Sequence, residues 1–273
     1  MCVSGGAHAA AGRATPDPSA RDPRRPARRT LCVVRRPALI VVIASLALAC
    51  GRAPTEPAVQ APSVDASADA ARVATSARYL ALGDSFTAGT GSREADAFPA
   101  RLADRWRRAG CDVQVTNLAV NGYATRDVID YELVQIAGPA PDVVTLAIGA
   151  NDIVRGVSTA DYAARVREIF DRLAQAGIPA TRVVTLPQPD WSRSPAAADF
   201  GDPAANGARI RELNALLRDL SAERGARYVD LSPRMQAQAD AKQLAPDGLH
   251  PSREAYDAWA EDLSRALPSP CGG

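Results

Sequence analysis

The stretch ALGDSFTAG (residues 81–89) places a serine, Ser85, directly after a short apolar run. Residues 78–83, which include the first part of this stretch, have the pattern of a strand that ends at Gly83. In open α/β sheets, ligands bind at the carboxyl ends of the strands. Ser85 is therefore either a nucleophile at such an edge or only a polar residue in a turn, and the rest of the chain must separate the two hypotheses.

Five apolar runs alternate with amphipathic stretches through the last two thirds of the chain. Helical spacing occurs around Leu102 and Trp106, over 128–136, over 162–173, over 210–220 and over 256–267. Strands separated by helices favour one parallel sheet covered on both faces, which is an α/β fold. The five expected strands are Tyr79 to Leu82, Val113 to Leu118, Val143 to Ile148, Arg182 to Leu186 and Arg227 to Leu231.

Polar residues follow these strands at the edge where a composite site would form. The blocks are Gly83-Asp84-Ser85, then NLAVNG (residues 117–122), GAND (residues 149–152) and, before the last helix, DGLHP (residues 247–251). The loop after the fourth strand carries Trp191 and Phe200, which either line the pocket or pack within the loop.

Only two histidines exist, His8 and His250, and His8 lies in the N-terminal leader. If a histidine activates Ser85, it must therefore be His250. Asp247 lies three residues earlier, close enough to hold the imidazole. Ser252 is expected to cap the final helix.

Acyl transfer also needs hydrogen-bond donors aimed at the oxyanion that forms in the transition state. The backbone N–H groups of Ser85 and Gly122 and the side-chain amide of Asn151 are the candidates. A glycine at position 122 lets the backbone come close to a substrate.

The four blocks resemble those of the SGNH, or GDSL-like, hydrolase superfamily. Ser85, Gly122, Asn151 and His250 match in order across residues 78–267, although Phe86 stands where many members have Leu. The resemblance implies a three-layer α/β/α, flavodoxin-like fold, Ser85 as nucleophile, Asp247 and His250 as the rest of a triad, and Gly122 and Asn151 as oxyanion donors. The G-x-S-x-G pattern of the common α/β-hydrolases is missing, because Thr87 takes the place of its second glycine.

The expected activity is ester hydrolysis through an acyl-enzyme, with no metal and no organic cofactor. Acyl transfer to another acceptor and deacetylation of a glycan would use the same residues and stay open. A lipid-anchored binding protein with an inactive site is the alternative from another class. The expected partner is a small-molecule or lipid ester, and the oligomeric state is not predicted.

The N-terminal part of the chain has the features of an export signal. Residues 1–49 carry eight arginines and two aspartates, so the rest of the chain is net acidic, which argues against nucleic acid as a partner. Two arginines precede an apolar run over 38–49 that is too short to span a bilayer. The run ends in LALAC, which resembles the lipobox of bacterial lipoproteins with Cys50 as the lipidated residue, although ordinary cleavage and secretion remain open.

Composition then divides the chain into an extension and signal peptide (1–49), a lipidated cysteine and flexible linker (50–77), a hydrolase domain (78–268) and a short tail (269–273). This organisation predicts an extracytoplasmic protein, either secreted or held at a membrane. Outside the leader and the anchor, two cysteines remain, Cys111 and Cys271. An oxidising extracytoplasmic compartment would allow a disulfide between them, and two buried free thiols are the alternative.

Overall fold

A computed structural model describes residues 75–272 of the chain. Its centre is a parallel sheet in the order β2-β1-β3-β4-β5. The strands are β1 (Ser76–Gly83), β2 (Asp112–Asn117), β3 (Val143–Ala147), β4 (Val183–Thr185) and β5 (Arg227–Tyr228). This confirms the predicted α/β fold with a five-stranded parallel sheet, in the flavodoxin-like strand order.

Two strand boundaries differ from the predictions by more than one residue. β1 begins at Ser76, two residues inside the segment expected to be linker, and pairs there with Asp112. β5 ends at Tyr228 and not at Leu231. The chain leaves the sheet because the Asp230 carboxylate accepts a hydrogen bond from Ser232 N, which starts the next helix.

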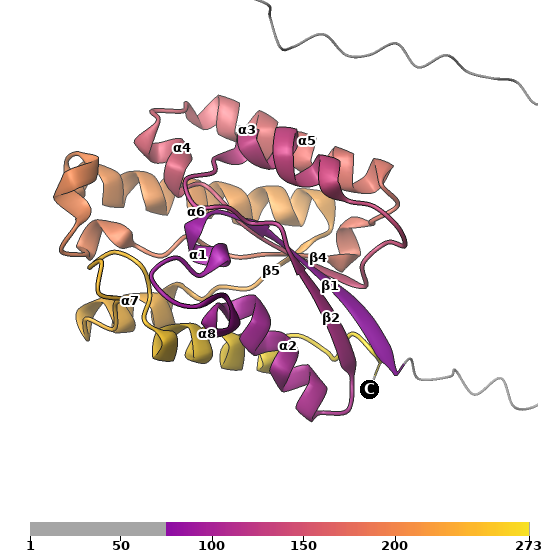
Figure 1. Ribbon diagram of the computed structural model, residues 1–273. Helices are drawn as coiled ribbons and strands as arrows, with labels where there is room; N and C mark the ends of the chain where they lie inside the picture. Colours follow the sequence, from indigo (N-terminus) through magenta and orange to yellow (C-terminus); the bar gives the residue numbers. More distant parts are fainter. Residues whose placement is uncertain (1–74, 273) are drawn as a thin grey trace, which may run out of the picture. The chain divides into compact units, whose positions relative to one another are not determined.

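Helices cover both faces of the sheet (Figure 1). Apolar side chains of α5 and α6 pack on one face together with those of β3, whereas α2 and α8 pack on the other with Tyr79 and Val113. The longer helices are α2 (Phe98–Arg108), α5 (Thr159–Gln175), α6 (Pro203–Arg224), α7 (Ser232–Asp240) and α8 (Arg253–Ala266). Ser252 caps α8 as predicted, since its Oγ accepts a hydrogen bond from Ala255 N.

Short helical turns follow several of the strands. They are α1 (Ser85–Ala88), α3 (Thr125–Asp127) and α4 (Ala150–Val154), together with the single turns η1 (Glu94–Asp96), η4 (Ala180–Arg182), η5 (Trp191–Arg193) and η6 (Ala197–Phe200). α1 starts almost directly after the carboxyl end of β1. α3 and α4 each start after a short loop that follows β2 and β3, respectively.

The stretch 128–136, expected as one helix, has two different helical forms. After α3 the chain runs through η2 (Val128–Glu132), which is a π-helical turn, and then η3 (Leu133–Gln135), which is a 3₁₀ turn. Val128 and Ile129 are buried as their apolar spacing predicts, but Glu132 is buried as well. A π turn adds a residue to the helical repeat and is frequent at functional sites.

Cys111 precedes β2, and its sulfur is bonded to that of Cys271 in the C-terminal segment. Both residues are buried. No helix among residues 75–272 is long and apolar enough to cross a membrane. Cys50 and the expected signal peptide lie outside the described residues.

Candidate active site

Three of the predicted site residues lie where the strand order reverses. Ser85 follows β1 and Asn151 follows β3, its sheet neighbour, while Gly122 lies in the loop after β2 on the other side of β1. The crevice between such strands is the usual ligand site of doubly wound sheets. The sheet order therefore brings these three positions, far apart in the sequence, to one edge.

The turn that carries Ser85 depends on the two residues before it. Gly83 has a φ of +152°, and a Cβ there would lie 2.3 Å from Ala147 O, so only glycine fits. Asp84 then caps α1, because its Oδ1 accepts a hydrogen bond from Phe86 N at 3.1 Å. Ser85 is consequently the first residue of a helical turn, and only 5% of its surface is exposed.

Asp247 and His250 form a hydrogen-bonded pair. Asp247 Oδ2 lies 2.8 Å from His250 Nδ1, and Asp247 Oδ1 accepts the backbone N–H groups of Leu249 and His250, each at 3.0 Å. Burial opposes ionisation of Asp247, but these hydrogen bonds outweigh it and hold the pKa of the carboxyl below its usual value. With Nδ1 bound to a carboxylate, Nε2 is the nitrogen left for proton transfer.

Contacts with α1 and the loop after it place this pair beside Ser85. The Phe86 and His250 rings lie 5.1 Å apart, centre to centre. Gly91, three residues after α1, has a φ of +83°, and a Cβ there would be 2.8 Å from Asp247 Oδ2. Glycine at position 91 thus allows the backbone to lie against the Asp247–His250 pair.

The candidate oxyanion donors are held by a network between α4 and the loop after β2. Asn151 Nδ2 donates to Tyr123 O at 2.9 Å, which uses one of its two N–H bonds and leaves the other for a ligand. Arg155, at the end of α4, donates to Gly122 O at 2.6 Å. Among residues 75–272, the backbone N–H groups of Ser85 and Gly122 have no hydrogen-bond acceptor, so both are free for a ligand.

Ser85 Oγ itself forms no hydrogen bond within the described part of the chain. The nucleophile–base contact is therefore open in this structure. Catalytic hydrogen bonds are often long in free enzymes and shorten when substrate binds.

Three carboxyl groups are buried close to this edge. Asp84, Glu132 and Asp152 each have no exposed surface. Asp152 accepts hydrogen bonds from Thr125 N and Oγ1 and lies 3.6 Å from Arg165, yet burial still raises its pKa. Burial also raises the pKa of Asp84 to about 8 and that of Glu132 to about 9.

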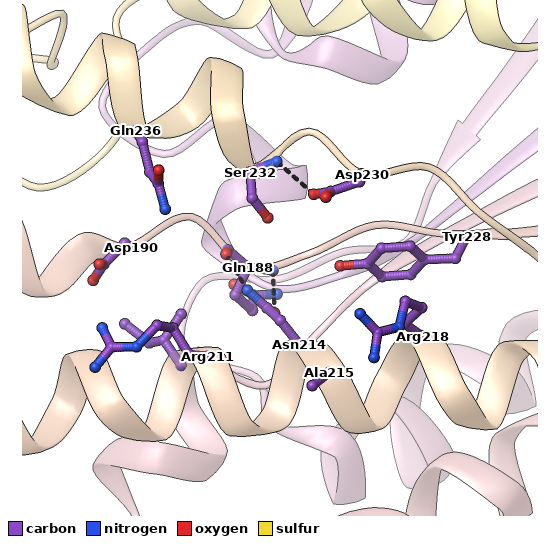
Figure 2. Close-up of a pocket in the computed structure, with 11 residues that line it drawn as sticks. Gln188, Asp190, Arg211, Asn214, Ala215, Arg218, Tyr228, Asp230, Ser232 and Gln236 are labelled. Carbon is purple, nitrogen blue, oxygen red and sulfur yellow. Dashed lines mark hydrogen bonds between the residues drawn. The ribbon is translucent and has the colours of Figure 1, made fainter.

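A polar groove of about 180 Å³ lies farther along the same sheet, between α6 and α7 (Figure 2). Arg211 and Arg218 line it from α6, whereas Asp190 and Asp230 come from the loops after β4 and β5. Asp190 also borders a small apolar cavity lined by Phe86 and Leu249. The loop after β4 thus extends from the groove to the residues that flank Ser85 and His250.

The two aromatic residues of that loop pack against each other. Trp191 is buried and Phe200 is exposed, with ring centres 5.9 Å apart. Trp191 lines the small apolar cavity beside Phe86 and contributes to the core. Trp191 therefore packs within the loop and also lines this cavity.

Several residues that shape the site were not anticipated from the sequence. Gly91 belongs to no recognisable motif, and Tyr123 contributes only a backbone oxygen. Glu132 resembles any charged residue on an exposed helical face, so nothing in the sequence signals its burial. Thr125, next to the Gly122 loop, is a polar residue whose partner, Asp152, is distant in sequence.

Comparison with known proteins matches residues 81–258 to the model of the GDSL-like Lipase/Acylhydrolase family. No curated protein matches the chain. Among solved structures, a member of the lipolytic protein G-D-S-L family from Veillonella parvula is 16% identical with a TM-score of 0.56, covering 70% of this chain and 97% of that chain.

Two further solved structures are similar in fold. The extracellular lipase from Streptomyces rimosus is 20% identical with a TM-score of 0.51, covering 70% of this chain and 100% of its own. An acetyl xylan esterase from Geobacillus stearothermophilus is 18% identical with a TM-score of 0.55, covering 71% and 95% respectively. At these identities the likeness establishes a common fold.

Proposed function

Because the chain belongs to the GDSL-like lipase/acylhydrolase family, we propose that it is a serine esterase that hydrolyses carboxylic esters through an acyl-enzyme. The observation that carries this proposal is the 2.8 Å contact between Asp247 Oδ2 and His250 Nδ1, in a loop packed against the turn of Ser85. A carboxylate on Nδ1 fixes the imidazole tautomer that a general base needs.

In the proposed reaction, His250 Nε2 takes the proton of Ser85 Oγ as the oxygen attacks the ester carbonyl. The negative charge on the carbonyl oxygen is stabilised by the Ser85 and Gly122 N–H groups and by the free N–H of Asn151. His250 then protonates the departing alcohol, and the acyl group stays on Ser85. A water molecule, deprotonated by His250, releases the acid and restores the serine.

A specific observation favours one variant of this function, the deacetylation of a carbohydrate. The groove of Figure 2 has polar walls of both charges, which suit a ligand with several hydroxyl groups more than an acyl chain. One of the similar folds belongs to an acetyl xylan esterase. Acyl transfer to a bound hydroxyl would use the same residues.

An activity panel separates these possibilities. Initial rates with p-nitrophenyl acetate, butyrate and laurate measure acyl preference, and release of acetate from acetylated xylooligosaccharides measures glycan deacetylation. If the groove binds the alcohol part, Arg211→Ala should raise KM for the glycan ester and leave the p-nitrophenyl acetate rate unchanged. Arg172→Ala, on α5 outside the groove, is the matched control.

Labelling with a fluorophosphonate tests the proposal itself, because an activated serine attacks its phosphorus, forms a P–O bond and releases fluoride. We expect mass spectrometry to find the adduct on Ser85, and Ser85→Ala to abolish both labelling and hydrolysis. An unlabelled but folded wild type would instead favour the alternative of a binding protein with an inactive site.

We also propose that the protein is exported, with residues 1–49 as leader, Cys50 as a lipidated N-terminus, 50–77 as linker and 78–268 as the hydrolase domain. The bond between Cys111 and Cys271 supports an oxidising compartment. Cys50→Ser should move the protein from the membrane fraction to a soluble extracytoplasmic pool. A wild type that is already soluble, with an unmodified cysteine, would indicate ordinary secretion.

A further inference from the structure

Glu132 contacts the nucleophile turn directly, although it is 47 residues away from Ser85 and belongs to none of the four sequence blocks. Its Oε2 accepts a hydrogen bond from Gly83 N at 3.0 Å. Gly83 is the last residue of β1 and lies two positions before Ser85. The π-helical turn η2 ends at Glu132, and the side chain has no exposed surface.

Asp84, the neighbour of Gly83, is the second buried carboxyl at this turn. Its Oδ1 caps α1 through Phe86 N, whereas its Oδ2 has no hydrogen-bond partner among residues 75–272. Glu132 Oε1 likewise has no partner within the described residues. Each carboxyl group thus uses one oxygen to hold a backbone N–H next to Ser85, while its other oxygen is enclosed in the protein.

The groups that face this pair carry no positive charge. The charge of Asp127 acts on Glu132 and that of Asp152 on Asp84, while Asp84 acts in turn on the neutral hydroxyl groups of Tyr162 and Tyr256. The guanidinium groups of Arg155 and Arg165 act on Asp152 and not on the pair. A buried carboxylate without a cation is strongly disfavoured, so both groups are held in the neutral form.

We propose that Glu132 is a positioning residue for the nucleophile, which keeps Gly83 and the first turn of α1 in place as long as the Glu132–Asp84 carboxyl pair is uncharged. This inference rests on the proposed function, in which Ser85 is the nucleophile. Ionisation of the pair would put a negative charge beside the oxyanion site and loosen the turn, which together oppose the transition state. The pair is expected to titrate as a unit, with activity falling above about pH 8.

Two substitutions at Glu132 separate its hydrogen bond from its charge. Glu132→Gln keeps an acceptor for Gly83 N–H but cannot ionise, so we expect kcat at pH 7 within about twofold of wild type and a less steep alkaline decline, because only Asp84 can still ionise. Glu132→Leu removes the acceptor, and we expect kcat to fall roughly tenfold at every pH with KM nearly unchanged, because the nucleophile is misplaced.

Asp130→Asn is the matched control, since Asp130 lies on the same turn η2 but is exposed and paired with Arg126. Its pH profile should coincide with that of wild type. Circular dichroism at each pH shows whether a variant is folded. At each pH from 6 to 10, kcat and KM are measured with p-nitrophenyl acetate. The rate of fluorophosphonate labelling is measured over the same range.

The inference is overturned if folded Glu132→Leu has the wild-type kcat, or if Glu132→Gln retains the wild-type alkaline decline. Failure of the proposed function has a different signature, because Ser85→Ala would then retain hydrolysis and wild type would not be labelled. An inactive Ser85→Ala combined with unaltered Glu132 variants therefore rejects the positioning role alone.

Discussion

Removal of the Cys111–Cys271 bond should weaken the fold without changing the chemistry. The bond closes a loop with a sequence separation of 160 residues. In the chain-entropy model a loop of this length restricts the unfolded state enough to stabilise the fold by about 5 kcal/mol, and loss of natural disulfides typically costs about 2 to 5 kcal/mol. The double variant Cys111→Ala/Cys271→Ala should therefore lose several kcal/mol of unfolding free energy.

Urea unfolding followed by circular dichroism measures this difference, and reduction of the wild type with a phosphine gives an independent comparison. The slope of the free energy against urea should increase in the variant, because its unfolded chain is less compact. The value of kcat per folded molecule should not change, since Cys111 lies at the amino ends of the strands and Ser85 at the carboxyl ends. Equal unfolding free energies for the variant and the oxidised wild type would refute the reasoning, and so would a large loss of kcat in the folded variant.

Three further predictions concern the site. Ser85→Ala, His250→Ala and the double variant should all lose nearly the same activity toward p-nitrophenyl acetate, because each change disables one shared proton transfer; additive losses would contradict this. Asn151→Ala should lower kcat by about 10² to 10³ with little change in KM, as expected for one oxyanion donor. Because burial raises the pKa of Asp84 to about 8 and that of Glu132 to about 9, these two groups bind more protons in the folded chain than in the unfolded one above about pH 4. Their contribution to the unfolding free energy should thus be greatest below that pH and fall until about pH 9, and Glu132→Gln should remove the part due to Glu132 in urea titrations at each pH.

The sheet could be predicted because each strand is an apolar run with turn residues at its end. Val143 to Ala147 is such a run, and it is followed by Gly149 and Asn151. β5 was predicted too long, because apolar Val229 and Leu231 continue the pattern while a side-chain hydrogen bond at Asp230 already turns the chain. The stretch 128–136 has helical spacing, but periodicity alone does not distinguish α, π and 3₁₀ turns.

The candidate site residues could be named from the sequence because each lies within a short block, such as Asp247 and His250. Their support could not be predicted in the same way. The contact of Glu132 with Gly83 joins residues 49 apart, and the packing of Gly91 against Asp247 joins two loops. Such contacts depend on how the elements pack in three dimensions, and they have no local pattern.

The direction of β1 also determines how far the reactive edge lies from the point at which the linker joins the domain. The chain enters the domain at Ser76 and reaches the serine turn after one strand of eight residues, a run of about 26 Å. The point of attachment and the reactive edge are thus at opposite ends of the sheet. A linker that joins the domain at Ser76 would therefore leave the reactive edge uncovered, so that esters of the surrounding envelope or medium could reach it.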